Sequence, residues 1–200
     1  MMRVSEYAEQ ADTETAADDL AVVERARADR RAFAPLYHRY AEPVYRFCYR
    51  RLGHPDAAAD ATGQVFTRAL AGLDGFRGGS FRAWLFAIAH NAVLDDLRRR
   101  RPDLPIDAAL DVQADDPDGA PEPVAIAGDQ RRELLAALTQ LPDDQRGIVE
   151  MRLAGLKGPE IAEALGRSHA AIKSSQFRAY ARLRQILRVE PGPEETTNAS

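Results

Sequence analysis

The sequence predicts an all-α protein built from two small helical domains and an acidic, proline-rich linker between them. Apolar residues recur at three- and four-residue steps on both sides of residues 102–125, as they do on the buried face of a helix. The segment 102–125 itself holds five prolines and seven acidic residues without a basic one, so no helix is expected there. A chain of 200 residues with 45% hydrophobic composition is long enough for two such domains, each with its own core.

The first domain is expected at residues 18–101, after a disordered acidic segment at 1–17. Its helical pattern continues with little interruption to Leu52, and the glycine and proline of Gly53–Pro55 end it. A second helix follows from about Asp56 to Leu70 and is closed by a loop with four glycines. The single cysteine of the chain excludes an internal disulfide, and its apolar helical setting predicts a buried thiol.

A third helix is expected at residues 81–101, with Ser80 as its N-cap. Apolar residues at helical spacing, among them Phe81 and Trp84, form its inward face. The run Arg98–Arg101 closes this helix at the negative end of its dipole.

Charge is arranged in blocks that cancel only in the total. Residues 1–27 have a net charge of −4, whereas residues 28–101 hold thirteen arginines against seven acidic residues, a net charge of +6. The linker is wholly acidic, and residues 126–190 return to +3. Two basic blocks around an acidic segment indicate two modules that bind polyanions.

The second domain is expected at residues 126–190, followed by a disordered tail at 191–200. Four helical stretches are predicted, and the last two have the layout of a helix-turn-helix. Gly166 is suited to the left-handed turn between them, and Ser168 can cap the last helix.

The last predicted helix has two different faces. Its packing face consists of Ile172, Ala179, Leu183 and Ile186. Its other face carries residues that suit the major groove of DNA: Lys173, Ser174, Phe177 and Arg178. In a helix-turn-helix protein this face enters the groove with its N-terminal end first.

Four stretches of the chain match the pattern of one known family, in that family's order. They are AFAPLYHRYAEPVYRFCYRRLG, FRAWLFAIAHNAVLDDLRRR, LPDDQRGIVEMRLAG and EIAEALGRSHAAIKSSQFRA. With them the chain resembles the extracytoplasmic-function subfamily of RNA polymerase sigma factors, over roughly Leu20 to Leu187 without the linker. By this resemblance the two domains are sigma region 2, a helical bundle, and sigma region 4, a helix-turn-helix.

The resemblance implies a function, partners and a location. Region 2 would bind core RNA polymerase and the minus-ten promoter element, and region 4 the minus-thirty-five element. The chain would direct core polymerase to specific promoters and initiate transcription. It would not itself be an enzyme, and no cofactor is expected. The implied partners are the β′ clamp helices and β flap of core polymerase, promoter DNA and, as for many relatives, an anti-sigma factor.

The family's contact residues carry over one position at a time. The minus-thirty-five contacts correspond to Lys173, Ser174, Phe177 and Arg178. The minus-ten contacts correspond to Phe76, Arg77, Ser80, Asn91, Asp95, Arg98 and Arg99. The residues that dock on polymerase correspond to Asp60, Thr62 and Gln64.

Some positions depart from the family's pattern or admit a second interpretation. In the docking helix, further acids of the family are absent from residues 58–66, and Gln176 stands where the packing face has an apolar residue. Phe76, Phe81 and Trp84 offer rings on which unpaired bases can stack, although most of this set is expected in the core.

Two other classes of function stay open. A stand-alone helix-turn-helix regulator would suit the last sixty residues, but the first block lacks the strand pattern of a phosphoacceptor or ligand-binding domain. A degenerate sigma-like protein that only binds another regulator would suit the altered segment 58–66. The four histidines are scattered without partners at ligand spacing, and no catalytic constellation is found, so neither a metal site nor an enzyme is expected.

The cellular location follows from what the sequence lacks. No apolar run approaches the length of a membrane span, and the first ten residues, MMRVSEYAEQ, have no apolar stretch like that of a signal peptide. A cytoplasmic protein without a membrane partner is expected, associated with the nucleoid when bound to polymerase.

Overall fold

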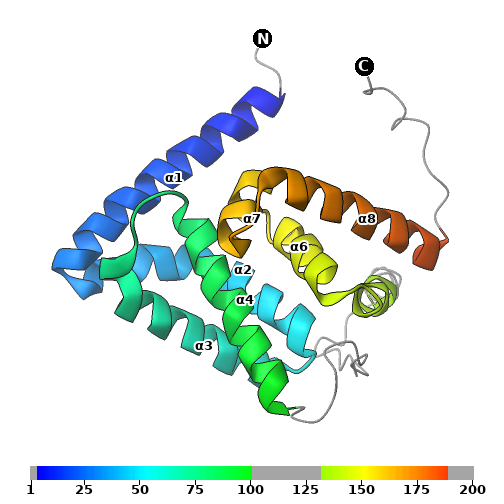
Figure 1. Ribbon diagram of the computed structural model, residues 1–200. Helices are drawn as coiled ribbons and strands as arrows, with labels where there is room; N and C mark the ends of the chain where they lie inside the picture. Colours follow the sequence, from blue (N-terminus) through cyan, green and yellow to red (C-terminus); the bar gives the residue numbers. More distant parts are fainter. Residues whose placement is uncertain (1–3, 101–131, 189–200) are drawn as a thin grey trace, which may run out of the picture.

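The computed structural model describes residues 4–100 and 132–188, with side chains from Glu14 onward, and it is helical without a strand in these ranges (Figure 1). The elements of the first part are α1 (Val4–Ala28), η1 (Arg30–Phe33), α2 (Ala34–Leu52), α3 (Pro55–Gly72), η2 (Leu73–Gly75) and α4 (Phe81–Arg100). In the second part residues 132–139 are helical, followed by α6 (Asp143–Leu153), α7 (Gly158–Leu165) and α8 (His169–Leu187). The predicted linker 102–125, the tail 191–200 and Arg101 lie outside the described residues.

The three helices α2, α3 and α4 form the bundle predicted for the first domain. Gly53 ends α2 in the left-handed conformation with φ 70°, where its N–H donates to the Tyr49 carbonyl at 2.9 Å. Inside the bundle the Phe47 and Phe86 rings meet edge to face, with their centroids 5.6 Å apart. The Cys48 thiol is buried as predicted, and burial raises its pKa to about 12.

The N-terminal helix α1 differs from the prediction for residues 1–17. It begins at Val4, inside the segment expected to be disordered, because the sequence from there to Ala28 has neither a proline nor a glycine and is rich in alanine and glutamate. A single 3-10 turn, η1, then separates α1 from α2. The Asp29 carboxylate caps this turn by accepting from the Arg31 N–H at 3.0 Å, so the helical pattern before Leu52 is two helices rather than one.

A buried carboxylate fastens α1 to α2. The Asp19 side chain is almost fully buried and accepts hydrogen bonds from the Tyr40 hydroxyl and from the Arg39 guanidinium. Burial raises the pKa of Asp19, and burial beside that carboxyl also raises the pKa of Tyr40. Asp18, the neighbouring residue, also pairs with Arg39, at 2.5 Å, but on the exposed side.

The helix-turn-helix forms as predicted, through local backbone chemistry. Gly166 has a φ of 61° and ends α7 in the left-handed region, which glycine adopts without steric cost. The Ser168 hydroxyl caps α8 by accepting from the Ala171 N–H at 3.2 Å. Ile172, Ala179 and Leu183 are buried on the packing face of α8.

The two domains share one core, which is a difference from the expectation of separate cores. Ile148, Met151, Leu156 and Ile161 of the second domain belong to the same buried cluster as the side chains of α2, α3 and α4. Figure 1 shows the reason in the arrangement of the helices: α4 lies between α3 on one side and α6 and α7 on the other. Among the described residues, a small second cluster around Leu138 and Leu183 belongs to the second domain alone.

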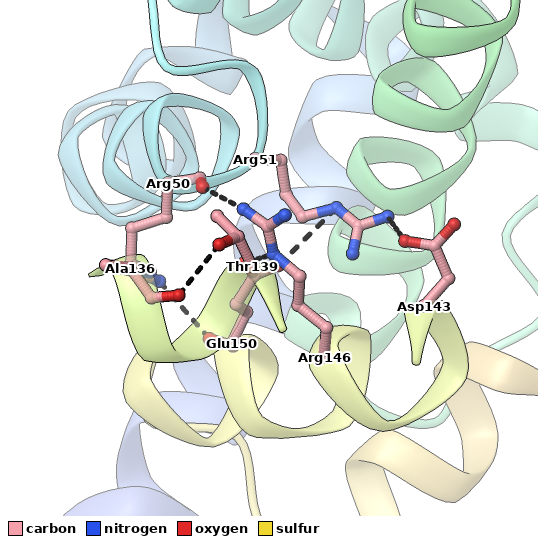
Figure 2. Close-up of polar contacts among 7 residues, drawn as sticks. All are labelled: Arg50, Arg51, Ala136, Thr139, Asp143, Arg146 and Glu150. Atoms are coloured by element: carbon pink, nitrogen blue, oxygen red, sulfur yellow. Dashed lines mark hydrogen bonds and ion pairs between the residues drawn. The ribbon is translucent and has the colours of Figure 1, made fainter. Parts of the chain in front are cut away.

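Buried charges cross the seam between α2 and α6 (Figure 2). The Arg51 side chain is 0% exposed, and its guanidinium lies 3.1 Å from the Asp143 carboxylate and 3.6 Å from that of Glu150. Glu150 also accepts from Arg146 Nε at 2.8 Å, and Arg146 in turn donates to the Arg50 carbonyl. Removal of charge from water at a seam is costly, and these contacts offset the cost only in part, because Arg51 Nε, Arg51 Nη1 and Glu150 Oε2 are buried without a hydrogen-bond partner.

A histidine lies at the same seam. His90 of α4 is packed so closely against α6 that a Cβ atom on Gly147 would be 3.1 Å from its Cε1 atom. Burial lowers the pKa of His90 to about 4; the Arg51 charge acts in the same direction and the Asp143 charge against it. His90 is therefore neutral at pH 7 in this packed form.

Candidate nucleic-acid interface

The predicted recognition face of α8 is exposed along its length. The surface residues of this face are Lys173, Ser174, Phe177 and Arg178, and Phe177 is 68% exposed. A phenylalanine so exposed is a large apolar group without a partner in the described part of the chain. Such a group suits contact with a thymine methyl or another apolar base edge in the major groove.

Two serines of α8 position the arginine of this face. Arg178 Nη1 donates to Ser174 Oγ at 2.9 Å, and Nη2 donates to the buried Ser175 Oγ at 3.2 Å. The guanidinium is thereby oriented before any DNA is bound, which lowers the entropy lost on binding.

The packing face of α8 contains a residue that the sequence analysis placed wrongly. Ser175 is buried between Ile172 and Ala179, whereas Gln176 is only half-buried and donates from its amide to the Tyr180 hydroxyl at 2.9 Å. The polar residue on the packing face is thus Ser175, whose hydroxyl lies 3.3 Å from the Asp144 carboxylate of α6. Gln176 therefore does not weaken the core.

Phe76 was predicted as a minus-ten contact, but the structure places it in the core with 3% exposure. Its ring packs against Trp84 and Phe81, with centroids 5.4 Å and 6.0 Å away. Burial of an aromatic ring among other rings stabilises the fold and leaves no face for a base. Trp84, which is half-buried, is the ring of this cluster that reaches the surface.

Two arginines that the sequence analysis missed hold the glycine-rich loop in place. Arg27 of α1 donates to the Phe76 carbonyl and, at 3.4 Å, to the Leu73 carbonyl. Arg30 of η1 pairs with the Asp74 carboxylate at 2.6 Å. These contacts join residues more than forty positions apart, and no local signal in the sequence reports them.

The other residues predicted to contact the minus-ten element are distributed over the loop and α4. Arg77, Asn91, Arg98 and Arg99 are exposed. The Asp95 carboxylate lies 3.3 Å from Arg68 of α3 and 3.9 Å from Arg98. It therefore links α3 to α4 and partly neutralises the positive charge at the C-terminal end of α4. Ser80 caps α4, with its hydroxyl 3.1 Å from the Ala83 N–H, as predicted.

The three residues of α3 predicted to dock on polymerase do not share one surface. Asp60 is exposed and Gln64 is half-buried, but Thr62 is 9% exposed and donates to the Ala58 carbonyl at 2.7 Å. The hydroxyl of Thr62 is satisfied within its own helix, so this residue contributes to packing and not to a docking surface. Asp60 and Gln64, one helical turn apart, remain together on the outer side of α3.

Two further observations in the described ranges concern metal ligands and membrane spans. No group of three or more histidine, cysteine, aspartate or glutamate side chains gathers there. None of the helices in those ranges combines the length and apolar character of a bilayer span.

Two family models match the chain. Sigma-70 region 2 matches residues 36–102, and Sigma-70, region 4 matches residues 131–183. The first range covers all but the first two residues of the bundle of α2, α3 and α4, and the second covers α6, α7 and α8 up to residue 183.

Individual relatives agree with the family models. The sigma factor BldN of Streptomyces coelicolor is 35% identical over 170 residues, which cover 83% of this chain and 64% of BldN. The sigma factor SigK of Mycobacterium ulcerans is 30% identical, and the match covers 85% of this chain and 94% of SigK. Among solved structures, CnrH in complex with the cytosolic domain of CnrY is similar with a TM-score of 0.65 and 26% identity, over 86% of this chain and 97% of that chain.

Proposed function

This chain belongs to the extracytoplasmic-function subfamily of RNA polymerase sigma factors, and from that premise we propose that it directs core RNA polymerase to specific promoters. Sigma factors are transcription initiation factors and not enzymes. In the proposal, residues 18–101 engage the minus-ten element and core polymerase, and residues 126–190 engage the minus-thirty-five element.

The observation that carries the proposal is the exposed face of α8. It presents two cations and one large apolar ring on the N-terminal half of the second helix of a helix-turn-helix. Cations supply affinity for phosphates or guanine, and the ring supplies an apolar contact to a base. Within the described part of the chain, the Phe177 ring is left largely uncovered by other side chains.

For the minus-ten element we propose a smaller set than the sequence analysis expected. Arg77, Asn91, Arg98 and Arg99 are exposed and can meet the backbone and bases of an unpaired strand. Trp84 is the ring on which a base can stack, in place of Phe76.

For polymerase we propose docking through Asp60 and Gln64 of α3. The β′ clamp helices are the partner of this helix in the family, and region 4 would meet the β flap. CnrH was solved in complex with the cytosolic domain of CnrY. We propose that this chain also binds a further protein, an anti-sigma factor. Its place of action would be the cytoplasm, on the nucleoid.

The decisive experiment is transcription in vitro with purified core polymerase on a pool of promoter fragments. The parent chain should yield a transcript whose template defines the promoter. Combined Lys173→Ala and Arg178→Ala should abolish it, whereas Arg46→Ala, an exposed arginine paired with Glu42 on α2, should not.

Two outcomes would replace the proposal. Binding of duplex DNA without any dependence on core polymerase would favour a stand-alone regulator. A chain that neither binds core polymerase nor supports transcription would be the degenerate protein that the altered 58–66 helix also allows.

A further inference from the structure

The recognition arginine of α8 is joined by hydrogen bonds to a buried serine and, through it, to a carboxylate of α6. We propose that Ser175 and Asp144 are positioning residues: they hold Arg178 in one orientation and thereby make it selective for guanine, without contacting DNA themselves. The inference rests on the proposed function, because it deepens the recognition that the exposed face of α8 is proposed to carry out.

Three hydrogen bonds connect the two helices. Arg178 donates from Nη1 to Ser174 Oγ at 2.9 Å and from Nη2 to Ser175 Oγ at 3.2 Å. Ser175 Oγ in turn donates to Asp144 Oδ2 at 3.3 Å. A serine hydroxyl has one hydrogen to donate and two lone pairs that accept. Because Ser175 gives its hydrogen to Asp144, its oxygen is left to accept from Arg178, and donors and acceptors match at every step.

Ser175 is the fixed point of this relay. It is 0% exposed, whereas the Asp144 side chain is 52% exposed and Arg178 lies on the surface. A serine inside a helix often turns its hydroxyl to the carbonyl one turn earlier in its own backbone. The Asp144 carboxylate is a charged acceptor and forms the stronger hydrogen bond. It therefore directs the Ser175 hydroxyl across to α6 and fixes the oxygen that Arg178 contacts.

The relay directs the guanidinium toward the end of α8 that would enter the major groove. Long side chains of a helix lean back over the preceding turn, and both serines lie in that turn, three and four residues before Arg178. The serines use two of the five N–H donors of the guanidinium, so three remain. Guanine presents two acceptors, O6 and N7, in the major groove. The positioned guanidinium can therefore still make the bidentate contact with guanine.

Positioning affects the choice of base more than the total affinity. An arginine without such restraints can turn to a phosphate or to another base edge, and contacts with phosphates carry no sequence information. The restraint by Ser175 disfavours these alternatives. Loss of the relay should therefore weaken the preference for guanine, while binding of unrelated sequences, which depends on positive charge, should change little.

Substitutions at the two positioning residues separate the acceptor from the charge. Ser175→Ala removes the relay at its centre, and Asp144→Ala removes the acceptor on α6. Asp144→Asn also loses the charge but keeps an oxygen that can accept from Ser175. Asp144 lies 3.6 Å from Arg167 as well. Both Asp144 variants weaken that ion pair, so the difference between them isolates the hydrogen bond to Ser175.

Glu133 provides the control for charge. It is exposed on another helical segment of the second domain, residues 132–139. Glu133→Gln removes one negative charge, as Asp144→Asn does, without touching the relay. It should leave the preference for guanine as it is in the parent.

The first measurement is selection of duplexes by the full chain from a random pool. The guanine that Arg178 contacts is the position at which Arg178→Ala abolishes the preference. The affinity for the selected duplex is then compared with that for the same duplex carrying adenine at this position. For Ser175→Ala and Asp144→Ala this ratio should fall about fivefold, as expected when a side chain is no longer held in place before binding. For Asp144→Asn and Glu133→Gln it should stay within about twofold of the parent ratio.

The second measurement needs no DNA. Rotation about the two Cζ–Nη bonds of Arg178 can be followed by the NMR line shapes of its Nη resonances in the full chain, and Arg178→Lys identifies these resonances by their loss. In Ser175→Ala and Asp144→Ala the rotation should be about tenfold faster, because a hydrogen bond from a charged donor is lost or weakened. Asp144→Asn and Glu133→Gln should rotate at the rate of the parent.

Several outcomes would overturn the proposal. They are an unchanged guanine preference in Ser175→Ala, an equal loss in Asp144→Asn and Asp144→Ala, and a parent chain without any guanine preference that depends on Arg178. Circular dichroism confirms that each variant is folded, and should Ser175→Ala not fold, the two variants of the half-exposed Asp144 decide. Neither measurement needs polymerase or a promoter. Failure of the transcription experiment with these results as expected would therefore refute the proposed function and not the relay.

Discussion

Replacement of Asp19 by asparagine and by alanine should separate the effect of its hydrogen bonds from that of its charge. The carboxylate is 2% exposed and accepts from both Tyr40 and Arg39. Asparagine keeps an oxygen that can accept from Tyr40, whereas alanine leaves that buried hydroxyl without a partner. Asp18→Ala is the matched control, because Asp18 also pairs with Arg39 but is half-exposed.

The expected sizes follow from burial. An unsatisfied buried hydroxyl costs about 1–3 kcal/mol, so Asp19→Ala should lower the free energy of unfolding by about that amount. Burial raises the pKa of Asp19, so its ionised form costs stability as the pH rises through that pKa, and asparagine removes this cost. Asp19→Asn should therefore stay within about 1 kcal/mol of the parent, and so should Asp18→Ala, a surface pair.

The assay is urea unfolding of the full chain at pH 7.5, followed by the fluorescence of Trp84, the only tryptophan of the chain. Trp84 lies in the same domain as Asp19, so its signal reports the unfolding that the substitutions affect. Equal losses for the asparagine and alanine variants would show that the charge matters and not the acceptor, and would refute the reasoning. An Asp18→Ala loss as large as that of Asp19→Ala would do the same.

Three further predictions concern the seam and the proposed contacts. Because the pKa of His90 is lowered to about 4 in the packed form, the packing of the domains should be fully stable above about pH 6.5 and should weaken as the pH falls toward 4. Small-angle X-ray scattering as a function of pH would measure this as a rise in the radius of gyration, and His90→Gln should remove the dependence. Arg178→Ala should weaken promoter binding by about 1–3 kcal/mol if the Arg178 side chain contacts a base. Lys173→Ala should reduce the slope of log affinity against log salt concentration by about one if Lys173 contacts a phosphate. Equal losses on all DNA sequences would contradict the base contact of Arg178. Asp60→Ala should weaken binding of core polymerase and spare duplex binding, so unchanged affinity in a pull-down with core would exclude α3 as the docking helix.

Local features were predictable from the sequence because their causes are local. The left-handed turn at Gly166 and the caps at Ser80 and Ser168 depend on a few neighbouring backbone groups, and all three occur as expected. The exposed face of α8 was predictable for a similar reason, since helical periodicity alone puts Lys173 and Phe177 opposite the packing face.

The errors arose where burial depends on distant parts of the chain. Phe76 lies in a loop, and only the packing of α4 decides that its ring is covered. Thr62 has a polar side chain on a helix, but its hydroxyl bonds to its own backbone and its flank is buried. The charges of Arg51 and Glu150 gave no sign of burial, because these residues lie far apart in the sequence and pair across the seam between the domains.

The lone Cys48 makes the chain unusually convenient for chemical labelling. Its thiol is buried and has a pKa of about 12, so at neutral pH it is neither accessible nor ionised, and only the thiolate reacts with maleimides or disulfide reagents. A cysteine introduced on the surface would be modified selectively, without prior removal of the native one. Slow reaction at Cys48 itself would then time the opening of the bundle of α2, α3 and α4, an event distinct from separation of the two domains.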